Sequence, residues 1–97
     1  MKLYLITAPK SSDYWDKYDS AVVAAKSPAD ARKIHPSDNV TYVRDGQWMG
    51  TYAEGGEWIL DDCSGWVKYA ERKQVKVKYL GETKRKRGLI LASYTPA

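Results

Sequence analysis

The stretch YDSAVVAAKSPADARKIHP, residues 18–36, decides the fold because it contains the longest run of small apolar residues and the clearest helix start. Residues 20–25 (SAVVAA) carry no charge and include two adjacent valines. Such a run is typical of a central strand that is covered on both faces of its sheet. We therefore predict a buried strand that leads directly into a short helix.

The helix is predicted from Pro28 to His35 by signals at both of its ends. The Ser27 hydroxyl can accept a hydrogen bond from the backbone N–H of Asp30, and proline is favoured at the first helical position. Asp30 also places a negative charge in the first turn, where the helix dipole favours it. Pro36 ends the helix at or before His35.

The middle of the chain is predicted to form a three-stranded meander. Asp45-Gly46 separates the β-prone runs VTYVR and QWMGTYA, and this dipeptide suits the two positive φ angles of a type I′ turn. A second turn, EGGE at residues 54–57, leads into a third apolar run at residues 58–60. We expect the first of these turns to form a protruding hairpin.

Two more strands are predicted in the last third of the chain, and we expect them to pair as an antiparallel hairpin. Residues 74–82 alternate, with apolar residues on one side and Lys76 and Lys78 on the other, as in a half-solvated strand. Residues 89–94 (LILASY) are mostly apolar, and the polar connection GETKRKRG at residues 81–88 joins the two runs.

The chain of 97 residues is long enough for one modest core, so we expect a single domain over residues 1–97. Residues 2–7 (KLYLIT) supply a further strand. The predicted fold class is α+β: a mainly antiparallel sheet of four to six strands, with one short helix packed on one face and a protruding central β-hairpin.

Charge is unevenly distributed along the chain, although the net charge is only +4. Residues 66–97 contain nine Lys or Arg and two acidic residues, whereas residues 1–65 contain seven basic and ten acidic residues. The last third would therefore attract acidic partners. We find no apolar segment near the roughly 18 residues of a membrane span and no signal peptide, so we expect a cytoplasmic protein with no membrane partner.

The residue types that usually carry catalysis are sparse. His35 is the only histidine, and Cys63 is the only cysteine, which leaves no internal disulfide and no ligand set for structural zinc. No phosphate-binding glycine loop is present, and the adjacent Asp61 and Asp62 lack the further spaced oxygen ligands of a cation site. We expect no enzymatic activity, no cofactor and no metal.

Five aromatic residues are candidate anchors for a protein partner, because Trp and Tyr combine apolar area with a polar group. They lie in the acidic segment KSSDYWDKYD and in the predicted meander, and they are Tyr14, Trp15, Trp48, Tyr52 and Trp58. The alternative interpretation is a surface connection whose rings lean on the edge of the sheet, and nothing in the sequence separates the two.

Six basic residues are candidates for binding an acidic protein or nucleic acid. They lie on the predicted alternating strand and on the connection after it, and they are Lys76, Lys78, Lys84, Arg85, Lys86 and Arg87. Phosphate contacts by such residues give salt-dependent affinity, although no nucleic-acid-binding motif accompanies them. The alternative is a loop whose charges only keep the protein soluble.

The runs MKLYLI, YDSAVVAAKSPADARKIHP, VKVKYLGE and GLILASY together resemble a family of small uncharacterised proteins encoded by tailed bacteriophages and prophages. The similarity covers residues 1–6, 18–36 and 75–94, about half of the chain, and not the Trp-rich middle. It implies a phage accessory protein that acts in the cytoplasm of the host bacterium, and it brings no catalytic residues. Such proteins are often inhibitors of host defence, including CRISPR inhibitors, that act by binding.

These observations predict a non-enzymatic accessory protein that binds a host protein or defence complex. Two alternatives stay open: a nucleic-acid-binding module that uses the six basic residues, and a homo-oligomer that sequesters a small signalling nucleotide.

Overall fold

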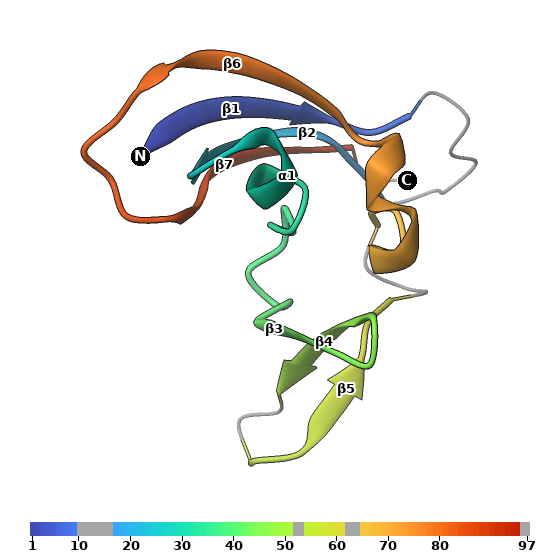
Figure 1. The fold of residues 1–97 in the computed structure, drawn as a ribbon. Coiled ribbons are helices and arrows are strands. Elements are labelled where there is room, and N and C mark those ends of the chain that lie inside the picture. Colours follow the sequence, from blue (N-terminus) through green and yellow to red (C-terminus); the bar gives the residue numbers. More distant parts are fainter. Residues whose placement is uncertain (10–16, 52–53, 62–64, 96–97) are drawn as a thin grey trace.

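The computed structural model describes residues 1–9, 17–51, 54–61 and 65–95, which form mostly antiparallel sheet with few short helices (Figure 1). One sheet has the strand order β6-β1-β2-β7, and the other has the order β3-β4-β5. The mainly antiparallel architecture is confirmed, but the strands form two sheets instead of one. The elements are β1 (Lys2–Thr7), β2 (Lys17–Ala25), α1 (Pro28–Ala31), β3 (Tyr42–Arg44), β4 (Gln47–Thr51), β5 (Glu57–Ile59), the 3₁₀ helix η1 (Tyr69–Gln74), β6 (Lys76–Glu82) and β7 (Gly88–Thr95).

Strands β1 and β2 form the centre of the four-stranded sheet, as the apolar run of β2 predicted. Side chains alternate between the two faces of a strand, so residues that lie opposite each other in register share a face. One face of this pair packs against α1 and β4. We call it the inner face, and its five core residues, each no more than 2% exposed, are Tyr4, Ile6, Ala21, Val23 and Ala25.

The prediction that the last two strands form a hairpin is wrong. β6 pairs with β1 and β7 pairs with β2, so the two strands lie at opposite edges of the sheet. Residues 83–87 cross the end of the β1–β2 pair, where the Thr83 N–H donates to the Met1 carbonyl at 2.9 Å (Figure 1). Five residues can span about 16 Å, which matches the three strand spacings of about 4.8 Å that separate the edges. The alternating pattern identified the strands but did not identify their neighbours.

The start of α1 follows the sequence prediction, while its end does not. The Ser27 Oγ accepts a hydrogen bond from the Asp30 N–H at 3.1 Å, and Pro28 occupies the first turn. The helix ends at Ala31, four residues before the predicted end. The next residues form tight turns in which the N–H groups of residues 33 and 34 bond three residues back. Pro36 disfavours helical backbone at residue 35, so the short helix cannot continue.

The central hairpin is confirmed. Asp45 and Gly46 have φ angles of 53° and 72°, the two positive values that a type I′ turn requires. β5 extends the hairpin to the expected three-stranded meander. A Cβ atom on Gly50 of β4 would overlap the Asn39 carbonyl oxygen and would lie 2.7 Å from the Leu60 Cδ1, so this position requires glycine.

The core lies between the two sheets and is rich in rings. The imidazole of His35 meets the rings of Tyr18, Trp48 and Trp66 edge-on, with centroid distances of 6.2, 5.0 and 6.5 Å. The Asp61 Oδ1 accepts hydrogen bonds from the backbone N–H groups of Trp48 and Tyr69, each at 3.0 Å. These contacts join the three-stranded sheet to η1 and fix its position under the inner face.

Candidate functional site

The second face of the four-stranded sheet carries a row of three aliphatic residues that continues into a lysine. Lys78, Leu5, Val22 and Leu91 lie opposite one another on four successive strands, because Leu5 pairs with both Lys78 and Val22, and Val22 pairs with Leu91. Alternation places them opposite the buried inner face, together with Leu3. We call this surface the outer face; it comprises Leu3, Leu5, Val22, Lys76, Lys78 and Leu91.

The outer face is much more accessible than the inner face. Leu91 is 67% exposed, and Leu3, Leu5 and Val22 are half-buried. β2 was predicted to be covered on both faces, and this is wrong for Val22, although Ala24 on the same face is fully buried. The physical reason is that α1 and the three-stranded sheet both lie on the inner side, so one layer covers one face only.

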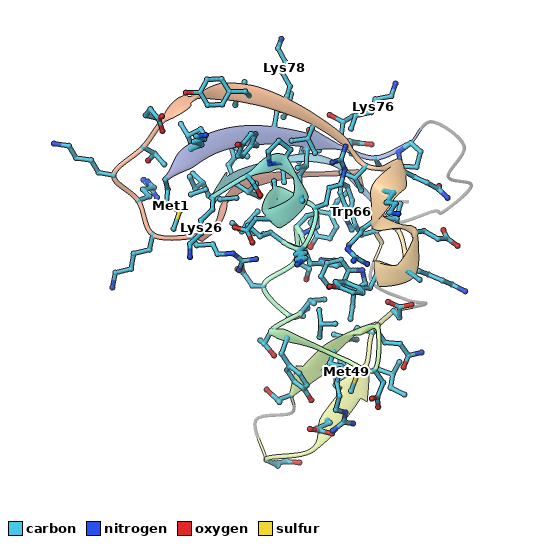
Figure 2. All side chains as sticks on the ribbon, in the orientation of Figure 1. Met1, Lys26, Met49, Trp66, Lys76 and Lys78 are labelled. Carbon is cyan, nitrogen blue, oxygen red and sulfur yellow. The ribbon has the colours of Figure 1, made fainter. Side chains whose placement is uncertain are left out.

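Two of the six predicted basic residues lie on the outer face. Lys76 pairs with Thr7, and Lys78 pairs with Leu5, and both lysines are exposed. Figure 2 shows both side chains pointing away from α1 and into solvent. The outer face therefore combines an apolar row with two cations along its β6 edge.

The other four basic residues do not form one patch with these two. Lys84, Arg85 and Lys86 are exposed on the connection that crosses the sheet end. Arg87 turns toward α1 instead, where its Nε donates to both carboxylate oxygens of Asp30 at 2.9 and 3.0 Å. Partial burial opposes ionisation of Asp30, but the Lys26 amide and the Arg87 guanidinium outweigh this and lower its pKa.

Of the predicted aromatic anchors, Trp48 is a core residue and is not available to a partner. It is 1% exposed, and its indole Nε1–H donates to the Val67 carbonyl at 2.8 Å. Trp58 is 40% exposed on β5, so it remains a candidate anchor. The other three candidates, Tyr14, Trp15 and Tyr52, lie outside the described residues, as does Cys63.

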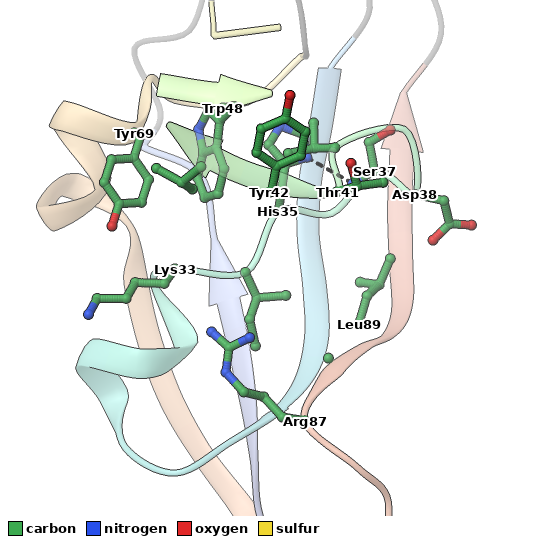
Figure 3. A pocket seen from close by; sticks show the side chains of 14 residues that line it. Lys33, His35, Ser37, Asp38, Thr41, Tyr42, Trp48, Tyr69, Arg87 and Leu89 are labelled. Carbon is green, nitrogen blue, oxygen red and sulfur yellow. Dashed lines mark hydrogen bonds between the residues drawn. The ribbon is translucent and has the colours of Figure 1, made fainter. Parts of the chain in front are cut away.

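A pocket of about 500 Å³ opens between the two sheets. Figure 3 shows Tyr42, Trp48 and Tyr69 on one side of it, with the side chains of Lys33 and Arg87 on the other. Lys33 follows α1, and Arg87 directly precedes β7, so residues 54 positions apart in the chain meet there. No local pattern in the sequence marks Lys33 as a candidate site residue.

His35 forms part of the pocket wall and is 5% exposed. Its Nδ1 accepts a hydrogen bond from the Ser37 N–H at 2.9 Å, which leaves the ring proton on Nε2. This Nε2 is buried and has no partner among the described residues. Burial lowers the His35 pKa to about 3, so the ring is neutral at physiological pH. A buried donor without a partner costs about 1–3 kcal/mol.

The described residues contain no group of three or more His, Cys, Asp or Glu that could hold a metal ion. None of the helices in these ranges is both long enough and apolar enough to span a membrane.

Comparison with known proteins identifies no relative of this chain. No family model, no curated protein and no solved structure matches it.

Proposed function

We propose that this protein acts by binding, and that its outer face docks on an acidic protein surface. The observation that carries the proposal is the row Lys78–Leu5–Val22–Leu91, which crosses all four strands and ends in a residue that is 67% exposed. Contiguous apolar surface on a small domain is typical of an interaction site.

The charges beside the row indicate the chemistry of the partner. Lys76 and Lys78 lie on the same face and at the same edge. Cations at the edge of an apolar patch steer association with a surface of opposite charge and define its orientation. An acidic surface with exposed aliphatic side chains would complement the outer face.

The resemblance to phage accessory proteins supports a bacterial host protein as the partner. The residues that carry it, 1–6, 18–36 and 75–94, supply the four strands of the sheet that bears the outer face. The proposed role is inhibition of a host defence complex, such as a CRISPR effector, in the host cytoplasm. His35 is buried, and its pKa of about 3 keeps it uncharged, which supports a role without chemistry of its own.

The experiment compares two exposed aliphatic residues on opposite parts of the molecule. Leu91→Asp changes the outer face, and Ile59→Asp, at a residue that is 59% exposed on β5, is the matched control. Wild-type and variant proteins are immobilised and used to capture proteins from bacterial lysate, and the captured protein is then measured by titration. We expect Leu91→Asp and Lys78→Glu each to weaken binding about 30-fold, the effect of losing an interface hot spot.

Three outcomes contradict the proposal. In the first, Ile59→Asp weakens binding and Leu91→Asp does not, which assigns the interface to the three-stranded sheet. In the second, Lys76→Glu and Lys78→Glu abolish retention of duplex DNA or RNA, which favours the nucleic-acid module. In the third, Leu91→Asp only lowers the mass in size-exclusion chromatography, which makes a second copy of this chain the occupant.

A further inference from the structure

We infer that the pocket between the two sheets binds a nucleotide-sized aromatic phosphate, of the class of nucleoside monophosphates. This site is separate from the outer face, because it lies under the four-stranded sheet on the side of α1. The proposal rests on three features of the pocket: its size, its two cations and its aromatic wall.

The size of the pocket matches a small molecule with two functional ends. Its volume of about 500 Å³ lies within the range of about 300–1,000 Å³ that small-molecule sites occupy. Inorganic phosphate would leave most of this space empty. A ligand that fills the pocket therefore carries a further group beside its anion.

Two cations can meet that anion. Asp30 binds Arg87 only through Nε, so both terminal nitrogens of the guanidinium have no hydrogen bond to any residue in the described ranges. The same carboxylate accepts from the Lys26 N–H at 3.0 Å, which holds Asp30 and with it Arg87 in place. The free edge formed by the two terminal nitrogens of the guanidinium suits the oxygens of a phosphate.

Lys33 contributes the second charge. It is exposed and has no ion pair within the described ranges, so its ammonium group is available to a ligand. The acidic residue of the pocket rim, Asp38, points away from both cations in Figure 3. Lys33 therefore faces the pocket as an unpaired cation within the described residues, and Arg87 faces it with its Nε bound to Asp30 and its terminal nitrogens left for an anion.

The opposite wall suits a planar apolar group. Trp48 and Tyr69 meet edge to face with ring centroids 5.0 Å apart, and both line the pocket with Tyr42. The guanidinium of Arg72 lies 4.1 Å from the centroid of the Tyr69 ring, which fixes this ring from outside. Trp48 is 1% exposed and supports the wall from behind, so Tyr42 and Tyr69, which are half-buried, are the rings that can contact a base. Rigid rings provide this contact area at little entropic cost.

The test is calorimetric titration of the intact protein with AMP and GMP, with adenosine, guanosine and inorganic phosphate as partial ligands. We expect a monophosphate to bind with a Kd below about 1 mM and to bind at least about 10-fold more tightly than its nucleoside or phosphate alone, since both ends contribute. Lys33→Gln should weaken binding about 10-fold. Lys86→Gln, the same charge change on the exposed connection, should have no effect.

The inference is overturned if neither AMP nor GMP binds at a concentration of about 10 mM, ten times the expected upper limit of the Kd. It is also overturned if Lys33→Gln and Lys86→Gln weaken monophosphate binding equally. Arg87→Lys keeps the charge and loses the guanidinium edges, so it should weaken the monophosphate more than inorganic phosphate. Thermal melting of each variant shows that it is folded. Leu91→Asp should leave nucleotide binding unchanged, which separates this result from the outcome for the outer face.

Discussion

The inner and outer faces of the four-stranded sheet are built from the same strands and differ in what covers them. Ile6 and Val23 on the inner face are completely buried, whereas their neighbours Leu5 and Val22 on the outer face are half-buried. All four residues are aliphatic and lie near the middle of their strands. Residue type therefore gives a face the capacity to be buried, and the position of the remaining chain decides which face is buried.

The largest expected effect is on the free energy of unfolding, which should respond differently to truncation of a side chain on each face. Ile6→Ala removes a fully buried side chain and should lower the free energy of unfolding by about 2–5 kcal/mol. Leu91→Ala removes a residue that is 67% exposed and should change it by no more than about 0.5 kcal/mol. Urea denaturation followed by tryptophan fluorescence measures both. Equal losses would mean that the outer face is also covered in the folded protein.

The next largest effect is the pH dependence of stability that the buried imidazole of His35 causes. The folded-state pKa of His35 is about 3, below the ordinary value of 6.5 in the unfolded chain. The unfolded state therefore binds the proton first as the pH falls. The stabilising contribution is complete above pH 6.5 and is lost as the pH falls toward 3, at about 1.4 kcal/mol per pH unit.

This loss should be visible between about pH 6.5 and 5.5, above the range in which ordinary Asp and Glu carboxyl groups, with pKa values near 4, titrate. His35→Asn keeps an acceptor for the Ser37 N–H and removes the titration, so its unfolding free energy should be flat over this range. Lys78→Gln on the outer face is the control and should keep the wild-type slope. A wild-type slope in His35→Asn would assign the pH dependence to another group.

The smallest effect concerns the ion pair that fastens the crossing connection to α1. The side chains of Arg87 and Asp30 are 42% and 21% exposed, so solvent screens their attraction. A double-mutant cycle with Arg87→Gln and Asp30→Asn should give a coupling free energy of no more than about 1 kcal/mol, and 1 M salt should reduce it. A coupling several times larger would show that the pair is a main contact between the crossing connection and α1.

Local features of the fold were predictable because neighbours in sequence determine them. The Ser27 cap needs only the Asp30 N–H three residues away, and the turn at Asp45-Gly46 needs only two residues that tolerate positive φ. The alternation in β6 likewise identified Lys76 and Lys78 as exposed. Each of these predictions depends on short-range geometry that tertiary contacts did not override.

The candidate sites were less predictable, because they depend on which strands become neighbours. Trp48 and Trp58 lie on adjacent strands of one small sheet, yet only Trp58 is accessible. The pocket joins Lys33 to Arg87, and the outer row joins Leu5 to Leu91 through Val22. The uncharged run of β2 also gave no indication of which face is exposed, because apolar residues occupy both faces of the strand.

Local sequence patterns are sufficient to specify most of the strands, the capped start of the helix, the central turn and the basic character of the last third. The placement of β6 and β7 at opposite edges, the open sheet face and the contact of Arg87 with Asp30 arise from the packing of distant segments. The physical reason is range: dihedral preferences and side-chain alternation act over a few residues, whereas strand order is decided by which arrangement buries the most apolar surface.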